Sequence, residues 1–412
     1  DIGNVCIVST FDKDYEHDKE ESYAYHSYSY DHHGVYSILD HQLDYKSLDA
    51  EKRLASSIEN LEALTKHMSS KIQPKTVDVD VVHLHDWQFG RVAEEIRKTR
   101  DKVGTKTPKI IATIHNGLYQ GNLILTPGIA KILGLDDSNY ENQRYSYLKT
   151  LIDNADEVVT VGNTYAEQFN TMFSGLCTKP IHAIPNGFDF EGTLLYKTAK
   201  TDNLINLPSI VLKGKPEEAT LAIGGRLTTE KGIEAILLAL PKLSEIYQNV
   251  VIFGEFQNKG IEELVKTYSP DNVKILGKIP RKQVLDVLKN SHAFLAPSLH
   301  EPFGLLPLEA MAQGAIPIVS DVSGHHDNFT DIRFDSVEGN AIVMKEVIDK
   351  TAFTMKPTKL SEIITKAGQD ARDLIDDKLG YAILIRNAAD QIKSERWSIK
   401  ECVKKHEEVY SL

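Results

Sequence analysis

Short apolar runs alternate with stretches of helical periodicity along most of the chain. From Val77 onward, runs of four to six residues are rich in Val, Ile and Ala, and each is followed by a turn or capping signal and a helix-like segment. This alternation is typical of βαβ units, in which helices cover both faces of a parallel sheet. It therefore indicates an α/β fold. The predicted strands are Val79–His83, Lys109–Ile114, Glu157–Val161, Ile181–Ile184, Ala219–Ile223, Val250–Phe253, Val273–Leu276, His292–Ala296 and Ile316–Ser320.

The first 76 residues follow this pattern less closely. Gly3–Thr10 reads as a strand, Gly34–Leu39 as another strand, and Leu48–Ser69 as a helix. Between the two strands, Asp14–Gly34 is crowded with Tyr, His and Asp, which predicts a solvated polar loop. A surface on which sugars stack is the alternative for this segment.

A change in composition divides the chain into two similar halves. Phe190–Glu218 is rich in Lys, Thr and Asn and contains spaced prolines, which is typical of a connection between domains. We predict an N-terminal domain at residues 1–190, a connection at 191–218, a C-terminal domain at 219–385 and a terminal helix within 386–412. Two Rossmann-like, doubly wound domains would face a central cleft, which is the expected ligand site.

The composition restricts the classes of function. Of 412 residues, 41% are apolar and 26% are charged, which is ordinary for a globular protein and unlike a disordered chain. The 47 Lys and Arg against 59 Asp and Glu give a formal charge of −12, so no general cationic field attracts nucleic acid or anionic lipid. Any phosphate that binds must therefore be held locally.

The cysteine content and the apolar runs bear on location. Cys6, Cys177 and Cys402 are too few and too far apart for a disulfide scaffold, which favours a reducing, cytoplasmic location. No run approaches the roughly 18 apolar residues of a membrane span, and the first thirty residues lack the pattern of a signal peptide. The chain begins at Asp1 instead of Met, which leaves open that it is part of a longer protein.

The first chemical motif is Gly224-Gly225-Arg226, followed by Lys231, at the end of a predicted strand and before a helix. Glycines allow backbone N–H groups to approach an anion, and a helix N-terminus adds partial positive charge. With two full cations beside them, these groups suit a diphosphate. The spacing completes neither GxGxxG nor a P-loop, so a tight turn with surface cations is the alternative.

The second motif runs from Glu301 to Gly314 and predicts a helix that has Pro307 in its first turn and ends at Gly314. Glu301 comes before this helix and Glu309 lies within its first turns. Both carboxylates are then placed to accept hydrogen bonds from the hydroxyls of a sugar or a ribose. Ordinary acids at a helix start are the alternative. The predicted buried stripe is Leu305, Leu308, Met311 and Ala312.

The third motif is His83-Leu-His85-Asp86-Trp-Gln, in which strand alternation points both histidines to the same side. Either histidine would be a hydrogen-bond donor in an active site, and simple packing of His83 is the alternative. An HxH pair also suits the metal of a hydrolase, although no spacing supports the more distant ligands. Those distant ligands would be His115, His182 and Asp321.

Together and in this order, the segments resemble the GT-B glycosyltransferases, and more narrowly the glycogen and starch synthases. The resemblance extends from about residue 35 to residue 410. In that fold the last helix crosses back to the N-terminal domain, and the segment from Trp397 to Tyr410 is similar to it. The matching segments are His83–Gln88 (HxHDW), Thr113–Gly121 (T-[IV]-H-N-x-x-Y-Q-G), Ile184–Asp189 (PNG-x-D), Arg226 with Lys231 (G-R-x(4)-K) and Glu301 with Glu309 (E-x7-E).

The resemblance implies a role for each candidate residue. Arg226 and Lys231 would neutralise the leaving diphosphate, and Glu301 would hold the sugar hydroxyls. His85 would make contacts around the sugar, and Asp49 falls where the synthases carry an active-site Asp. The nucleotide-sugar-binding set would be Gly224, Gly225, Arg226, Lys231, Glu301, Phe303, Gly304, Leu305 and, at the ribose, Glu309.

The implied reaction transfers a hexose, glucose by preference, from a nucleoside diphosphate sugar to a carbohydrate acceptor with retained configuration. Neither a metal nor another cofactor is expected. A same-fold transferase with a protein, lipid or small-molecule acceptor, or a scaffold without turnover, is the alternative. Two departures bear on this choice: Asp1–Gly34 does not reproduce the K-T-G-G loop of the synthases, and Glu309 stands where bacterial synthases commonly carry Tyr.

Overall fold

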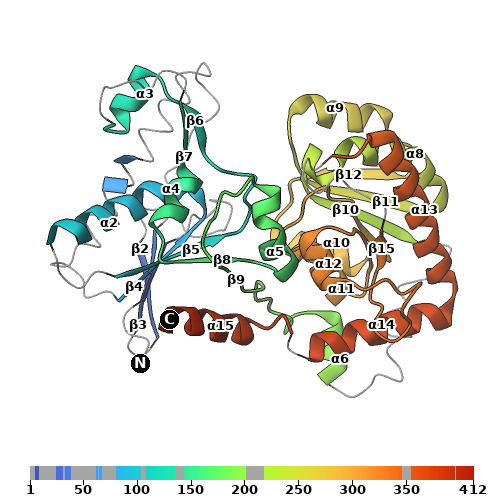
Figure 1. The fold of residues 1–412 in the computed structure, drawn as a ribbon. Coiled ribbons are helices and arrows are strands. Elements are labelled where there is room, and N and C mark those ends of the chain that lie inside the picture. The colour runs from blue at the N-terminus through green and yellow to red at the C-terminus, as the bar shows by residue number, and fades with distance from the viewer. Residues whose placement is uncertain are drawn as a thin grey trace. The chain divides into compact units, whose positions relative to one another are not determined.

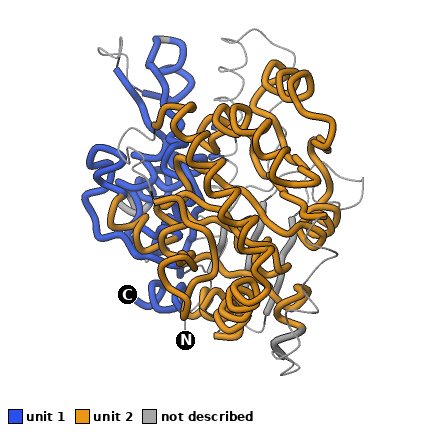
Figure 2. The backbone as a smooth tube through the Cα atoms, turned by 90° about the vertical axis from the view of Figure 1, so that its right-hand side faces the viewer, with its two compact units in different colours: residues 1–161, 169–184, 405–412 blue, residues 162–168, 185–404 orange. Residues whose placement is uncertain are grey.

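The chain forms two compact units (Figure 2). The N-terminal unit comprises residues 1–161, 169–184 and 405–412, and the C-terminal unit comprises residues 162–168 and 185–404. Within the part of the chain described, no helix has both the length and the apolar character that crossing a membrane requires. The computed structural model describes residues 5–8, 25–30, 33–38, 62–63, 65–66, 80–103, 108–135, 143–200, 218–345, 354–394 and 396–412.

A parallel sheet in the order β1-β4-β5-β8-β9 forms the core of the N-terminal unit (Figure 1). Its central strands are buried on both faces, which explains why they read as continuous apolar runs. The strands are β1 (Val5–Val8), β4 (Val81–His85), β5 (Lys109–Ile114), β8 (Glu157–Thr160) and β9 (Ile181–Ala183). The helical segments are η1 (Trp87–Phe89), α2 (Gly90–Val103), α3 (Pro127–Ile132), α4 (Tyr147–Asn154) and the end of α5 (Asn163–Met172), whose residues up to 168 belong to the C-terminal unit.

Two antiparallel strand pairs complete the described part of this unit. β2 (Tyr25–Tyr30) pairs with β3 (His33–Ile38), and β6 (Asn122–Ile124) pairs with β7 (Arg144–Ser146). The strand predicted at Gly34–Leu39 is therefore present, but the polar-loop prediction for Asp14–Gly34 was wrong at β2. Three tyrosines in six residues favour extended structure, and this propensity outweighs the polarity of the segment.

A six-stranded parallel sheet in the order β12-β11-β10-β13-β14-β15 forms the C-terminal unit. The strands are β10 (Thr220–Leu227), β11 (Asn249–Phe256), β12 (Val273–Gly277), β13 (Ala293–Ala296), β14 (Ile316–Ser320) and β15 (Ile342–Met344). The helical segments are α6 (Leu194–Lys200), η3 (Thr229–Lys231), α8 (Ile233–Ile246), α9 (Lys259–Tyr268), α10 (Arg281–Lys289), α11 (Leu305–Ala312), α12 (Ser323–Asn328), α13 (Pro357–Asp376) and α14 (Lys378–Lys393).

β10 is longer than its apolar run predicted. The predicted strand ended at Ile223, whereas the observed strand runs on to Leu227 and carries both glycines and Arg226 within it. Gly225 pairs with Gly254 of the neighbouring β11, and both have positive φ angles, 110° and 125°. The two glycines keep the strands paired in a backbone conformation that side chains rarely adopt.

α13 packs on α8 along the sheet (Figure 1). The hydroxyl of Tyr247, just after α8, donates a hydrogen bond to the carbonyl of Gly368 in α13, with an O–O distance of 2.9 Å. A Cβ atom at Gly368 would lie 2.7 Å from Leu243 of α8, so the small residue permits this close approach. The packing anchors α8, whose N-terminal end follows the predicted diphosphate motif.

The terminal helix, α15 (Ile399–Ser411), lies within the segment predicted for it. Residues 185–404 belong to the C-terminal unit, in which the backbone N–H of Phe188 donates a hydrogen bond to the carbonyl of Trp397 at 2.7 Å. Residues from 405 onward belong to the N-terminal unit, where Tyr410 contacts His83. The end of the chain therefore contributes to the N-terminal unit.

Candidate active site

Lys231 and Glu301 form an ion pair in the C-terminal unit. Lys231 follows β10, Glu301 follows β13, and these strands are parallel neighbours, so both residues emerge at the carboxyl edge of the sheet. The Nζ atom of Lys231 lies 3.0 Å from Oε2 of Glu301 and 3.1 Å from the carbonyl oxygen of His300. Both side chains are less than one fifth exposed. The structure thus brings together two residues that the sequence predicted for one site.

Burial and charge fix the protonation states around this pair. Burial alone would raise the pKa of Glu301, but Lys231 and His325 more than offset it and lower the pKa to about 2. Burial lowers the pKa of His300 to about 3, helped by the cation of Lys231, and lowers that of His325 to about 4 despite the opposing carboxylate of Glu301. At neutral pH Glu301 is therefore ionised and both imidazoles are neutral.

Arg226 reaches the same edge through an intervening acid. Its guanidinium donates to Oε1 of Glu230 at 2.7 Å, and the same oxygen lies 4.0 Å from Nζ of Lys231. Both cations therefore share Glu230, which the sequence analysis missed although it lies four residues after Arg226. A diphosphate here would compete with Glu230 and Glu301 for the two cations.

Glycine is required at the positions near the two cations for different physical reasons. A Cβ atom at Gly254 would lie 1.8 Å from the carbonyl oxygen of Gly225, so the paired strand ends require a glycine there. A Cβ atom at Gly224 would lie 2.2 Å from the ring of Phe253, so packing inside the sheet already demands this glycine. The sequence analysis missed Gly254, because its partner lies on another strand.

Glu309 lies in α11 and is held by an arginine that the sequence analysis missed. Both of its carboxylate oxygens accept hydrogen bonds from the guanidinium of Arg281, the first residue of α10. The Glu309 side chain is 8% exposed and that of Arg281 is 45% exposed. Burial raises the pKa of Glu309, and Arg281 opposes this rise. The exposed part of this bidentate pair is therefore the arginine.

The loop between the two glutamates is shaped by packing. Phe303 is buried, and its carbonyl accepts a 2.8 Å hydrogen bond from the side chain of Asn328. Gly304 has a φ angle of 92° and precedes α11. Leu305 is 39% exposed, so its prediction as part of the buried stripe was wrong: it lies at the exposed start of the helix. Of the predicted nucleotide-sugar residues in this loop, Phe303 and Gly304 are both buried.

A second histidine-rich site lies in the N-terminal unit. Nδ1 of His85, at the end of β4, lies 2.9 Å from Nε2 of His115. Burial, followed by the nearby His115, lowers the pKa of His85 to about 3, so its imidazole is neutral. Asp86 has a φ angle of 66° and accepts a 2.8 Å hydrogen bond from the backbone of His115. This bond ties together two segments that the resemblance placed in the active site.

His83 is a packed residue with both ring nitrogens engaged. Nε2 lies 2.6 Å from the Thr113 hydroxyl, and Nδ1 lies 2.8 Å from the Tyr410 hydroxyl. Among the residues described, no group of three or more His, Cys, Asp or Glu is placed to hold a metal ion. His182 and Asp321, the more distant ligands of the hydrolase alternative, pair instead with Glu157 and His326. Asp49 lies outside the described residues.

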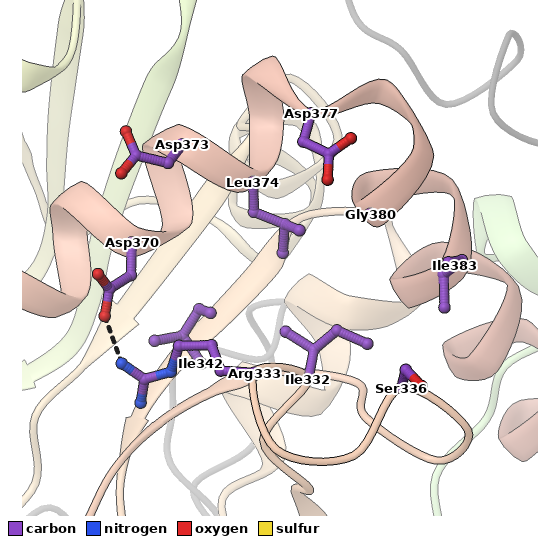
Figure 3. A pocket seen from close by; sticks show the side chains of 10 residues that line it. All are labelled: Ile332, Arg333, Ser336, Ile342, Asp370, Asp373, Leu374, Asp377, Gly380 and Ile383. Carbon is purple, nitrogen blue, oxygen red and sulfur yellow. Dashed lines mark hydrogen bonds and ion pairs between the residues drawn. The ribbon is translucent and has the colours of Figure 1, made fainter.

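A pocket of about 380 Å³ in the C-terminal unit has a different character (Figure 3). Its aspartates have structural roles: Asp370 pairs with Arg333, and Asp377 caps α14. None of the predicted site residues lines this pocket, so it is separate from the candidate active site. The lining residues are Ile332, Arg333, Ser336, Ile342, Asp370, Asp373, Leu374, Asp377, Gly380 and Ile383.

Two family models match the chain in succession. The model described as the starch synthase catalytic domain matches residues 8–179, and the model described as glycosyl transferases group 1 matches residues 211–355. The candidate site residues Arg226, Lys231, Glu301 and Glu309 lie within the second match. The two matches therefore fall in the two halves of the chain, and residues 180–210 and 356–412 lie outside them.

Similar proteins include bacterial glycogen synthases. The Clostridium perfringens glycogen synthase is 30% identical over 284 residues, which is 60% of this chain and 58% of that protein. The Clostridioides difficile glycogen synthase is 26% identical over 362 residues, which is 80% of this chain and 72% of that protein. The match thus spans less than two thirds of the C. perfringens protein.

Solved structures of the same fold cover nearly the whole chain. The catalytic domain of starch synthase IV from Arabidopsis thaliana, bound to ADP and acarbose, has a TM-score of 0.61 at 18% identity and covers 94% of this chain and 99% of its own. The sucrose-phosphate synthase of Thermosynechococcus elongatus has a TM-score of 0.61 at 15% identity and covers 99% and 98%. The chain therefore has the GT-B fold, and its sequence resembles those of the glycogen and starch synthases.

Proposed function

We propose that the chain transfers glucose from a nucleoside diphosphate sugar to an α-glucan-like acceptor, with retention of configuration. The observation that carries this proposal is the Lys231–Glu301 pair at the carboxyl edge of the C-terminal sheet. In open α/β sheets, ligands bind at this edge. The pair presents a cation for a phosphate and a carboxylate for hydroxyl groups at one place.

The cations would stabilise the leaving group. The bond from the anomeric carbon to the diphosphate breaks with its electron pair passing to the diphosphate, which gains negative charge in the transition state. Lys231 and Arg226 are fixed cations at the place where that charge develops, so their interaction is strongest in the transition state. The acceptor oxygen bonds to the anomeric carbon on the same face, and its proton passes to a diphosphate oxygen.

The carboxylates would orient the donor. Glu301 is ionised across the physiological range, because its pKa is about 2, so it can accept hydrogen bonds from sugar hydroxyls. Glu309, held by Arg281, would accept from the ribose with the lone pairs that the arginine does not use. The contact of His85 with the sugar, which the resemblance implies, stays a prediction.

The named relatives support the choice of donor and acceptor. The starch synthase structure contains ADP and acarbose, and the bacterial relatives are glycogen synthases. ADP-glucose with a maltooligosaccharide is therefore the first substrate pair to test. A small-molecule acceptor is the second candidate, because the sucrose-phosphate synthase structure has the same TM-score as the starch synthase.

The test is release of the nucleoside diphosphate. Purified protein would be offered ADP-, UDP- and GDP-glucose. Each donor would be tested without an acceptor, with maltooligosaccharides, with glucose 6-phosphate and with fructose 6-phosphate. We expect acceptor-dependent release of one diphosphate, and the stimulating acceptor decides between the two candidates. Absence of release together with absence of a donor-induced thermal shift would support an inert scaffold and reject the transferase.

A further inference from the structure

Glu301 has a second neighbour that can carry positive charge. His325, in α12, is fully buried, and its Nε2 atom lies 4.0 Å from Oε2 of Glu301. Its Nδ1 atom lies 3.1 Å from the carbonyl oxygen of Ser320. A carbonyl only accepts, so Nδ1 carries the hydrogen and, in the neutral ring, Nε2 is an acceptor.

This arrangement leaves a buried acceptor facing a carboxylate. Nε2 of His325 has no hydrogen-bond partner among the described residues, although more than nine tenths of the side chain is buried. Buried polar atoms are normally satisfied, because an unsatisfied one costs free energy. A proton on Nε2 would remove the mismatch by turning the facing acceptors into a charged donor and a carboxylate acceptor.

Packing holds the imidazole in this orientation. A Cβ atom at Gly304 would lie 2.6 Å from Cδ2 and 3.0 Å from Nε2 of His325, so the backbone of that loop lies directly against the ring. A Cβ atom at Gly324 would lie 2.3 Å from the backbone of Phe303, so the start of α12 is equally tight. The ring cannot readily turn away, and protonation is the change open to it.

The charges around His325 keep it neutral while Lys231 holds Glu301. The groups acting on it are Glu301 and Asp321, which favour the proton, and Lys231, which disfavours it. His300 is a neutral neighbour of the same pair. The other titratable side chains of α12 are engaged elsewhere, since His326 pairs with Asp321 and Asp327 accepts hydrogen bonds from Thr164. Burial and Lys231 therefore disfavour protonation of His325.

We propose that His325 is a positioning residue that holds Glu301 when Lys231 turns to the donor diphosphate. Nε2 takes up a proton from solvent, keeps it, and donates a hydrogen bond to Oε2 of Glu301. The proton returns to solvent when the nucleotide leaves. The role rests on the proposed function, because Lys231 gives up Glu301 only to a competing anion. Without the exchange, donor binding would leave a buried carboxylate short of its counterion, which is strongly unfavourable.

The consequence is that donor binding takes up a proton. His325 binds its proton more tightly in the donor complex than in the free protein. Donor binding is therefore favoured at low pH and weakens as pH rises through the pKa that His325 has in the complex. The slope approaches a tenfold increase in Kd per pH unit, about 1.4 kcal/mol, where uptake is complete. The diphosphate of a nucleotide sugar is fully ionised in this range, so it adds no titration of its own.

The experiment is calorimetric titration of the protein with ADP-, UDP- and GDP-glucose at pH 5.5, 6.0 and 7.0, in buffers with different ionisation enthalpies. We expect the wild type to take up a proton, and His325→Leu to take up none and to bind with a Kd that changes less with pH. His326→Gln is the matched control, because this adjacent imidazole is 56% exposed on its side chain, and its uptake should equal that of the wild type.

Further readouts separate positioning from simple packing. His325→Gln places an amide donor near Glu301 at every pH, so it should restore kcat relative to His325→Leu while keeping a flat pH profile. Wild-type binding without proton uptake, or equal uptake in His325→Leu, would overturn the role of His325 and leave the proposed function standing. Failure of all three nucleotide sugars to bind would overturn the proposed function and the role together.

Discussion

Lys231 shares its ammonium protons between the carbonyl of His300 and the carboxylate of Glu301, and in the proposed reaction it must also serve a diphosphate. Alanine at position 231 removes the charge where negative charge develops. We expect kcat to fall about 10²–10³-fold, or about 2.7–4 kcal/mol, which is the effect of removing one such donor. Steady-state release of the nucleoside diphosphate measures this change.

The control for Lys231→Ala is Lys242→Ala in α8. Lys242 is a surface lysine that pairs with Glu245, and both side chains are 65% exposed. Surface pairs contribute little, so this variant should keep both its rate and its stability. An unaltered rate in Lys231→Ala would reject the assignment of the diphosphate site.

Glu301→Gln tests the second half of the pair. The amide keeps the shape but accepts weaker hydrogen bonds from sugar hydroxyls, so kcat/KM for the sugar nucleotide should fall about 10–100-fold. The Kd of the free nucleoside diphosphate should stay nearly constant, since no sugar is present. Calorimetry with ADP beside ADP-glucose separates the two. A large loss of affinity for free ADP would mean that the roles of Glu301 and Glu309 are exchanged.

Arg281→Met tests whether the arginine keeps Glu309 ionised. Burial already raises the pKa of Glu309, and loss of the arginine removes what opposes this rise. The ribose contact needs the carboxylate, so it is present above the pKa of Glu309 and lost as pH falls through it. In the variant we expect KM for the donor to be larger than in the wild type. We also expect the increase of KM with falling pH to begin at a higher pH than in the wild type. Kinetics of the wild type, Arg281→Met and the exposed neighbour Lys282→Met from pH 5.5 to 8.5 measure this shift.

The sequence predicted the residues that belong to continuous motifs and missed those that depend on tertiary contacts. Lys231 and Glu301 come from separate motifs, yet each follows a strand, so parallel pairing could be expected to bring them together. Arg281 lies 28 positions before Glu309, and its own segment carries no chemical pattern. His325 likewise lies in a short helix, α12, which belongs to none of the chemical motifs. Such partners are fixed by how helices pack over the sheet, which spacing alone does not encode.

At the scale of elements, the pairing of β10 with β11 determines where β10 ends relative to the predicted diphosphate motif. The apolar run predicted an end at Ile223, because glycines normally weaken a strand. The strand continues because Gly225 and Gly254 are in register and both adopt positive φ. Strand was also missed at β2, where the polar composition predicted a loop although the tyrosines favour a strand. For the strands of the two parallel sheets other than β15, existence followed from the pattern and length followed from pairing.

Gly254→Ala should therefore disrupt this edge of the sheet. Its Cβ atom would lie 1.8 Å from the carbonyl oxygen of Gly225, at a φ angle of 125°. The strained backbone alone costs about 1–3 kcal/mol, and relief of the clash displaces β10 just before Lys231. We expect lower stability in urea unfolding and a lower kcat. Gly192→Ala is the control, because a Cβ atom there meets nothing within 4 Å, and unchanged stability of Gly254→Ala would contradict the strand register.

At the scale of the whole molecule, two units with separate cores each contain buried or half-buried histidines. His83 and His85 belong to the N-terminal unit, and His300 and His325 belong to the C-terminal unit. Burial is the first cause that lowers each of their pKa values, to about 3 for His85 and His300 and to about 4 for His325. The stability of each unit therefore depends on imidazoles that are neutral in the free protein, a property that the individual motifs did not reveal.

This dependence predicts how stability responds to acid. Below the usual pKa near 6.5 the unfolded chain binds protons that the folded imidazoles refuse, so the free energy of unfolding falls as pH falls. Each histidine contributes up to about 1.4 kcal/mol per pH unit between about pH 6.5 and pH 4, whereas Glu309 and Asp86, with raised pKa values, act in the opposite direction. Urea unfolding from pH 7.5 to 5.0 measures the slope for each unit. His325→Leu should remove close to one proton from the C-terminal transition only, and His326→Gln should leave it unchanged. An unchanged slope in His325→Leu would mean that this imidazole is already protonated in the folded protein.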